Sequence, residues 1–252
     1  MFEIKNLSAG YGGVPVLRDI SLVIPRGQVT VIAGPNGCGK STLLKALTGI
    51  LPAAGSVLLE GQALLTLSGR ERAQKVAFLP QNRQTPEITV KNLVLHGRFP
   101  YLAYPRCYRP EDHKIAEAAM AQMGIQELGD TPLNQLSGGQ RQKAYIAMAL
   151  AQDTPVILLD EPTTYLDIRH QLGIIRQAKE LAAQGKTVVM VVHDLPCAMA
   201  VADKIVLIEN GTVAAQGTPD EVFLSGHMDP VFGVTVNRIQ TQTGWQYYCT
   251  EE

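Results

Sequence analysis

One short glycine-rich run constrains the fold of this chain more than any other feature. The run GPNGCGKS, residues 34–41, follows an apolar segment, residues 28–33, whose β-branched side chains are typical of a strand buried on both faces. A helical pattern, residues 41–48, comes directly after it. Strand, glycine loop and helix in this order place backbone N–H groups and a helix N-terminus around a bound phosphate. The segment therefore predicts a phosphate-binding loop.

The residue types within the loop suit a nucleotide and its metal ion. Gly34, Gly37 and Gly39 leave the backbone N–H groups unobstructed, and the following helix adds roughly half a positive charge at its N-terminus. Lys40 is expected to reach the β- and γ-phosphates, while Ser41 offers a hydroxyl to Mg²⁺. The other loop positions are also expected to contact the nucleotide: Pro35, Asn36, Cys38 and Thr42. The pattern predicts binding of ATP with Mg²⁺.

Polar side chains follow two further apolar runs. Residues 156–159 lead into Asp160 and Glu161, and residues 187–192 lead into His193. We expect Asp160 to hold the water shell of the metal, and Glu161 to orient or deprotonate the attacking water. The neutral ring of His193 can donate to the γ-phosphate or hold that water. Because all three residues follow buried strands, we expect them at one edge of a single sheet.

The pentapeptide LSGGQ, residues 136–140, predicts a second anion site. Ser137 can cap the helix that begins there, and exposed N–H groups of the motif would point along the helix dipole; its polar and glycine members are Ser137, Gly138, Gly139 and Gln140. In isolation the pattern also suits an ordinary helix cap. A helical insert, residues 89–150, would hold the motif away from the loop of its own chain, so we expect a two-fold head-to-tail homodimer with ATP at the seam.

The remaining pattern predicts an α/β fold. We expect a P-loop NTPase core with a mainly parallel sheet, together with an N-terminal antiparallel β subdomain and an inserted α-helical subdomain. We expect a single domain over residues 1–252. The core and the β subdomain take residues 1–88 and 151–225, the helical subdomain takes 89–150, and 226–252 form a C-terminal β-hairpin cap that turns at Thr243 and Gly244.

Composition limits the classes of partner and the cellular compartment that we expect for this chain. The net charge is −1 and the sequence contains no block of like charges, which disfavours nucleic acid as a partner. The apolar runs are shorter than the ~20 residues of a spanning helix, and we expect neither a signal peptide nor a membrane span. The cysteines, at 38, 107, 197 and 249, lack paired spacing, so a reducing cytosol fits best. The helix N-terminus beside Lys40 predicts a reactive Cys38 thiolate that ATP protects.

Together with Gln81, these motifs resemble the nucleotide-binding domain of the ABC ATPases over nearly the whole chain. The resemblance implies a RecA-like core and assigns three further roles. The residue matching Gln81 senses the metal site and links it to a transmembrane partner, and the match to Asp167 signals across the dimer. Tyr11 is the best match for the aromatic residue that stacks on adenine; the alternative is a tyrosine that only forms part of a hairpin turn.

Two short stretches, residues 96–101 and 162–171, are similar to the ATPases of iron-chelate, haem and cobalamin importers. The resemblance implies a separate integral membrane permease, a periplasmic or extracellular substrate-binding protein reached through it, and a peripheral place on the cytoplasmic face of the bacterial inner membrane. The surface after Gln81, with Arg83 and residues 99–108, is expected to accept a permease helix, or else 99–108 are only an ordered loop. Residues 196–201 are more apolar than the resemblance leads us to expect.

Two other classes of function share parts of this pattern. A soluble ABC ATPase that transports nothing, such as an iron–sulfur assembly ATPase, stays open as the alternative. A P-loop kinase or GTPase is disfavoured because it explains neither LSGGQ nor the adjacent carboxylates of Asp160 and Glu161.

Overall fold

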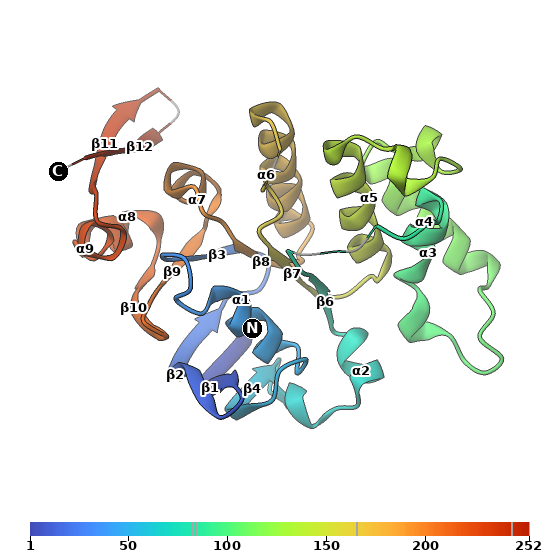
Figure 1. Cartoon of the computed structure of the whole chain (residues 1–252), viewed down its shortest axis with the longest axis horizontal. Coiled ribbons are helices and arrows are strands. Elements are labelled where there is room, and N and C mark those ends of the chain that lie inside the picture. The colour runs from blue at the N-terminus through green and yellow to red at the C-terminus, as the bar shows by residue number, and fades with distance from the viewer. Residues whose placement is uncertain (82, 84, 165, 243, 252) are drawn as a thin grey trace.

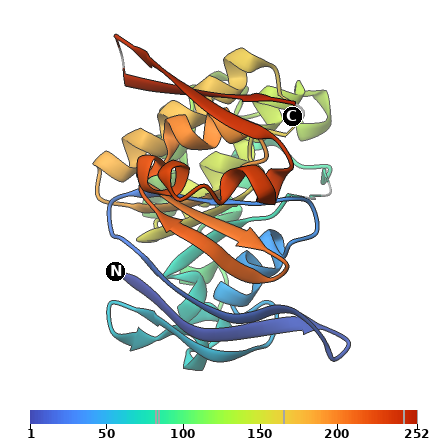
Figure 2. The same ribbon diagram turned by 90° about the vertical axis from the view of Figure 1, so that its left-hand side faces the viewer.

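The computed structural model describes residues 1–81, 83, 85–164, 166–242 and 244–251. Two sheets and their helices form most of the molecule, and a separate two-stranded ribbon projects at the C-terminal end (Figures 1 and 2). The α/β architecture, with an antiparallel N-terminal sheet and a mainly parallel central sheet, confirms the predicted fold class.

The N-terminal sheet is antiparallel. Its strands are β1 (Phe2–Tyr11), β2 (Val14–Ile24), β4 (Ala53–Leu59) and β5 (Gln62–Ala63), in the spatial order β2-β1-β4-β5. Burial alternates at the start of β1, where Phe2 and Ile4 face the core and Glu3 does not. This alternation is what a sheet with one buried face requires.

The central sheet carries the phosphate-binding loop. Its strands, in spatial order, are β10 (Thr212–Gly217), β9 (Lys204–Glu209), β3 (Val29–Ala33), β8 (Thr187–Val191), β7 (Val156–Asp160) and β6 (Val76–Leu79). All neighbouring pairs are parallel except β9 with β10. The carboxyl ends of β3, β6, β7 and β8 therefore meet at one edge of the sheet, which is where ligands bind in such folds.

Both faces of the central sheet are covered. Ile157 and Leu159 of β7 face one apolar cluster, and Leu158 between them faces the other. Helix α1 (Lys40–Leu47) and the N-terminal sheet cover the second face. Because every side chain of β3, β7 and β8 is buried, these strands are continuous apolar runs rather than alternating ones.

The inserted helices pack against the first face, together with α6 (Ile168–Ala183). They are α3 (Val90–His96), α4 (Pro110–Gln122) and α5 (Gly138–Ala151). A buried ion pair between Arg98 and Asp112, 2.9 Å apart, joins the end of α3 to α4, and Arg98 also donates to the carbonyl of Ala151 at 3.0 Å. The predicted helices over 90–96 and from residue 110 are confirmed, and the helix predicted at Ser137 begins at Gly138 with Ser137 as its cap.

Helix α7 (Leu195–Val201) is apolar because a second layer covers it. Its buried Leu195 and Met199 share a cluster with Val236 and Tyr247, which belong to β11 (Thr235–Thr241) and β12 (Gly244–Thr250), while its Ala198 and Val201 pack in the cluster on the first face of the central sheet. These strands pair antiparallel, as predicted for the tail. The unexpectedly apolar segment 196–201 thus has a packing explanation, and residue 243 of the predicted turn lies outside the described residues.

The smaller elements connect these layers. They are α2 (Gly69–Ala73), α8 (Pro219–Leu224), α9 (Met228–Phe232) and 3-10 helices at Leu64–Thr66, Phe99–Tyr101, Gln126–Leu128 and Leu133–Gln135. Within the described ranges, no helix has both the length and the apolar character needed to cross a bilayer.

Candidate active site

The backbone of the phosphate-binding loop favours glycine at three of its positions. Gly34, Gly37 and Gly39 all have positive φ angles, of 148°, 79° and 111°. A Cβ on Gly34 would lie 2.2 Å from the carbonyl oxygen of Ile208, and one on Gly39 would lie 2.6 Å from a methyl group of Leu17. At Gly37 the space is open. The loop therefore has the tight, uncluttered backbone that close approach of a phosphate requires.

The loop holds a positive charge next to the N-terminus of α1. The ammonium of Lys40, only 5% exposed, donates to the carbonyls of Gly34 and Pro35 at 2.8 Å each. Helix α1 begins at Lys40, its cap residue Gly39 provides no side-chain hydrogen bond, and its first turn carries no acid. The N-terminal N–H groups of α1 thus keep their capacity for an anion. The loop fits a phosphate chain.

Two oxygen groups meet beside the loop. Ser41 Oγ donates to Asp160 Oδ1 at 3.0 Å, joining the start of α1 to the end of β7. Burial raises the pKa of Asp160, the Ser41 hydrogen bond lowers it, and the neighbouring charge of Glu161 raises it further. A hydroxyl and a buried carboxylate next to a phosphate site are the ligand types that Mg²⁺ prefers, so this pair fits the predicted metal.

Glu161 is the meeting point of three segments. Its carboxylate accepts from Gln81 Nε2 and, at 3.1 Å, from Thr164 Oγ1, and it pairs with His193 Nε2. Its own N–H donates to the carbonyl of Val191 at 3.2 Å, and its φ of 50° is unusual for a residue other than glycine. A strained, buried carboxylate held by several partners is characteristic of functional sites.

These groups enclose a cavity of about 390 Å³. Its lining consists of Asn36, Gly37, Gly39, Lys40, Ser41, Thr42, Gln81, Glu161 and His193. The structure therefore brings together most of the predicted loop residues with Gln81, Glu161 and His193. Gln81, expected at the metal site, contacts Glu161 instead of Ser41 or Asp160. Gly34, Pro35 and Cys38 belong to the loop but are not part of the cavity lining. The carbonyls of Gly34 and Pro35 accept from Lys40, and Cys38 packs against Gly34.

The LSGGQ motif lies outside this cavity. Ser137 Oγ accepts from Gln140 N at 3.3 Å, and the Gln140 side chain accepts from Ser137 N at 3.0 Å, so the motif caps itself. Gly138 lines a different cavity, and Gly139 lies so close to the His170 ring that an added Cβ would come within 2.6 Å of it. Among the described residues, the motif contributes nothing to the lining around the loop of its own chain.

Asp167 and Tyr11 also lie apart from the cavity lining. Asp167 caps α6: its carboxylate accepts from His170 N at 2.9 Å and contacts His170 Nδ1 at 2.8 Å, which lowers the pKa of Asp167. Tyr11 ends β1 with its ring half exposed and the Lys45 ammonium 6.0 Å from the ring centroid. Lys45 belongs to α1, so Tyr11 lies beside the helix that follows the loop, but it does not line the cavity.

The predicted reactivity of Cys38 is wrong in its premise. Burial raises the pKa of the thiol, and this effect outweighs the nearby charge of Lys40, which lowers it. The side chain is 6% exposed and packs against Gly34. Desolvation disfavours a thiolate more than the adjacent ammonium favours it.

Sequence reasoning missed Thr164 and Gln142. Thr164 follows Glu161 by three residues in a tight turn, and Gln142 donates to the carbonyl of Pro162 at 2.7 Å from the middle of α5. The run of threonines after Glu161 is the only sequence signal for the first, and nothing in the sequence pairs Gln142 with Pro162.

Known proteins resemble the chain over nearly its full length. Residues 17–164 match the family described as ABC transporter. The petrobactin import ATP-binding protein FpuD of Bacillus anthracis is 44% identical over 223 residues, covering 87% of this chain and 82% of that protein. The hemin import ATP-binding protein HmuV of Streptomyces coelicolor is 40% identical over 229 residues, covering 90% and 81%. The predicted resemblance to importer ATPases is confirmed.

Solved structures match the fold. An inward-facing transporter described as of the metal-chelate type superimposes with a TM-score of 0.86 at 26% identity, covering 100% of this chain and 98% of that one. A dimeric bacterial ABC transporter cassette, MJ0796, matches with a TM-score of 0.75 at 30% identity, covering 87% and 99%. Given the loop, the carboxylate pair and these similarities, the chain belongs to the ABC transporter family, as an ATP-binding member that hydrolyses ATP.

Proposed function

We propose that this chain is the ATP-hydrolysing subunit of a bacterial importer that takes up an iron chelate through a separate membrane permease. A ferric siderophore is the first candidate cargo, and haem and cobalamin are the others. The observation that carries the proposal is the similarity, over about nine tenths of the chain, to the import ATP-binding proteins for petrobactin and hemin. The cargo itself would pass through the permease and would not contact this chain.

The loop would bind the phosphates of ATP. Gly37, Gly39 and Thr42 line the cavity, and their N–H groups and the α1 N-terminus would bind phosphate oxygens. Lys40 would exchange its loop carbonyls for phosphate oxygens. Ser41 and Asp160 would hold Mg²⁺, with Gln81 as a further candidate ligand; the ion would neutralise phosphate charge. Tyr11 would stack on the adenine, which its exposed ring beside α1 allows.

Glu161 would act as the general base. Attack of the water oxygen on the γ-phosphorus breaks the bond to the β,γ-bridging oxygen, whose electron pair leaves with ADP, while a proton of the water passes to Glu161. His193, Gln81 and Thr164 would hold the carboxylate, since all of them contact it. A displacement of Gln81 would therefore also displace the base.

The second half of each site would come from another copy. Ser137, Gly138, Gly139 and Gln140 would contact the γ-phosphate bound by the partner in a head-to-tail homodimer, and Asp167 would lie at the same seam. This arrangement is supported by the distance of LSGGQ from the cavity of its own chain and by the dimeric state of the related cassette. The self-capped motif would open its N–H groups to that phosphate.

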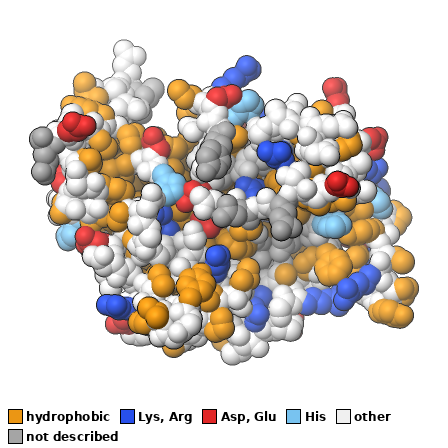
Figure 3. Space-filling view, in the orientation of Figure 1, with side chains coloured by type: hydrophobic (Ala, Val, Ile, Leu, Met, Phe, Trp, Pro, Cys, Tyr) orange, Lys and Arg blue, Asp and Glu red, His pale blue; other side chains and the backbone are white. Residues whose placement is uncertain are grey.

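A permease helix would dock beside α2. A cavity of about 450 Å³ there is lined by Gly69, Arg70, Ala73, Phe99, Pro100, Leu102, Tyr104 and Arg106. Phe99 is half exposed and Tyr104 almost fully exposed, and Figure 3 shows hydrophobic and basic side chains together over the loop between α3 and α4. Residues 82 and 84 of the predicted docking surface lie outside the described residues. This contact would hold the chain at the cytoplasmic face of the membrane and link it, through the permease, to a substrate-binding protein.

Uptake by a deletion strain tests the proposal. Cells lacking this gene are complemented with the wild-type chain, with Glu161→Gln, or with Arg176→Gln, an exposed arginine of α6 that serves as control. Uptake of ⁵⁵Fe as ferric siderophores, of hemin and of cobalamin is measured separately. We expect the wild type and the control to restore one of these activities and Glu161→Gln to restore none. Unimpaired uptake of all three without the gene, with soluble scaffold proteins copurifying instead of a permease, would favour the iron–sulfur assembly alternative.

A further inference from the structure

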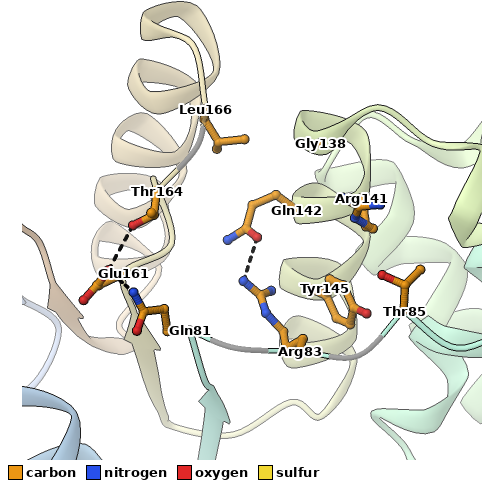
Figure 4. Close-up of a pocket in the computed structure, with 10 residues that line it drawn as sticks. All are labelled: Gln81, Arg83, Thr85, Gly138, Arg141, Gln142, Tyr145, Glu161, Thr164 and Leu166. Atoms are coloured by element: carbon orange, nitrogen blue, oxygen red, sulfur yellow. Dashed lines mark hydrogen bonds between the residues drawn. The ribbon is translucent and has the colours of Figure 1, made fainter.

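A second cavity of about 230 Å³ adjoins the nucleotide cavity (Figure 4). It lies between the start of α5, the segment after β6 and the turn after β7, and its lining includes Arg83, Thr85, Arg141, Gln142, Tyr145 and Thr164. Gln81 and Glu161 line both cavities. The contact between these two side chains therefore separates the space around the loop from the space around the arginines.

Arg83 is a partly buried cation that has one fully buried N–H group without a partner. Its Nη2 donates to Gln142 Oε1 at 2.8 Å, and its guanidinium carbon lies 4.6 Å from the centroid of the Tyr145 ring. Its Nη1 is buried without a hydrogen-bond partner, and within the described ranges no carboxylate forms an ion pair with it. Burial lowers the pKa of Arg83. Buried charges are normally paired, so an unmatched N–H of this kind calls for a missing anion or water.

A second cation faces the same space. Arg141 lies in the first turn of α5 and lines the cavity, and among the described residues its side chain has no ion-pair partner. Burial is the largest cause that lowers the pKa of Arg83; the charge of Arg141 also lowers it, while Tyr145 and Asp160 raise it. Two like charges that share an enclosed space repel each other unless an anion lies between them. The hydroxyl of Thr85 adds an uncharged donor to the same wall.

We propose that this cavity is a transient binding site for the inorganic phosphate released by hydrolysis, held by Arg83 and Arg141. The proposal rests on the proposed function, because it takes the loop cavity as the place where ATP is hydrolysed. Arginine suits such a ligand through its planar fork of donors. Phosphate is favoured over an acidic side chain of another protein because Gln81 and Glu161 line this cavity and the nucleotide cavity alike.

Phosphate formed in the nucleotide cavity would pass the side chains of Gln81 and Glu161, which line both cavities, to reach the arginines. Bound there, it would be separated from ADP, and this separation would oppose resynthesis of ATP.

Equilibrium binding tests the site directly. The wild-type chain is saturated with Mg²⁺ and a non-hydrolysable ATP analogue, which fills the γ-phosphate position, and potassium phosphate is titrated in by calorimetry at constant ionic strength. We expect one phosphate per chain, bound at least ten-fold more weakly after Arg83→Gln or Arg141→Gln. Arg83→Lys should retain more of the affinity than Arg83→Gln, and the exposed control Arg176→Gln should not change it. Absence of phosphate binding to the wild type, or equal binding by all variants, would overturn the proposal.

Single-turnover kinetics distinguish phosphate binding by Arg83 from an indirect effect of Arg83 on the position of Glu161. Acid quench measures bond cleavage, and a fluorescent phosphate-binding protein measures phosphate release in the same single turnover. For Arg83→Gln we expect cleavage within two-fold of the wild type and release at least five-fold slower. Slower cleavage followed by prompt release would make Arg83 a positioning residue and refute the site. A chain that binds phosphate in this way but imports no iron chelate would refute the proposed cargo and leave the phosphate site standing.

Discussion

The phosphate-binding loop and the LSGGQ turn are both glycine-rich entries into a helix, yet they treat their N–H groups in opposite ways. Helix α1 has no side-chain cap, and its lysine ammonium lies ready within the loop. Helix α5 has a complete capping box between Ser137 and Gln140. The N-terminal N–H groups of α1 are therefore available to an anion in the single chain, whereas Ser137 and Gln140 at the start of α5 already bond each other. The proposed contact of LSGGQ with a phosphate would have to compete with that capping box.

The largest effect should come from removing the general base. Glu161→Gln keeps the size of the side chain and its contacts with Gln81 and Thr164 but cannot accept a proton. We expect the rate of ATP hydrolysis to fall by ~10²–10⁴, with ATP affinity retained and a stable dimer formed in Mg-ATP. Phosphate release and light scattering measure these quantities. A variant that stays monomeric at saturating Mg-ATP would break the comparison, because LSGGQ would then have no phosphate to close on.

Loss of the loop lysine should affect binding itself. Lys40→Ala removes a charged donor to the phosphates, worth about 1.5–3 kcal/mol, so ATP affinity should fall by roughly ten-fold to 150-fold. Lys114→Ala, at an exposed position of α4, is the matched control. Fluorescence titration with a labelled ATP analogue gives the affinities, and circular dichroism checks the fold, since Lys40 also holds two loop carbonyls. Unchanged affinity in a folded Lys40→Ala would contradict the assigned site.

Removing the side-chain cap of α5 and that of α2 tests whether the LSGGQ cap does more than stabilise a helix. Ser137→Ala and Ser68→Ala both delete a capping box, at α5 and at α2, and each should lower the free energy of unfolding by about 1 kcal/mol. Urea titration measures this. Only Ser137→Ala should also reduce turnover and ATP-driven dimerisation, by several-fold, because only that cap lies at the proposed seam. Equal activities of the two variants would reduce the LSGGQ turn to an ordinary helix cap.

The smallest effect concerns the thiol inside the loop. Because burial raises the pKa of Cys38, less thiolate exists at pH 8 than for an unperturbed cysteine, and its reactivity should increase only at higher pH. Iodoacetamide should therefore modify the exposed Cys107 first, as peptide mass spectrometry would detect, and ATP should protect little. Labelling of Cys38 as fast as Cys107 would show that the loop opens far more than its burial allows.

Much of the site was predictable from local pattern. Strand, loop and helix over 28–48 are contiguous, and the polar residues after 156–159 and 187–192 had to meet at one sheet edge once those runs were strands. The contact of Gln81 with Glu161 was not predictable in this way, since 80 residues separate them. Neither was the pairing of Gln142 with Pro162, which depends on how α5 lies against the core.

The sequence alone determined the chemical inventory and its order along strands and helices, because residue type and spacing act through the local backbone. Only the tertiary structure decided which groups are buried and which distant side chains meet. It changed the expected state of Cys38, explained the apolar helix α7 through the C-terminal strands, and revealed the two arginines around one cavity. Burial and electrostatic interaction depend on distances in space, and spacing along the chain does not fix those distances.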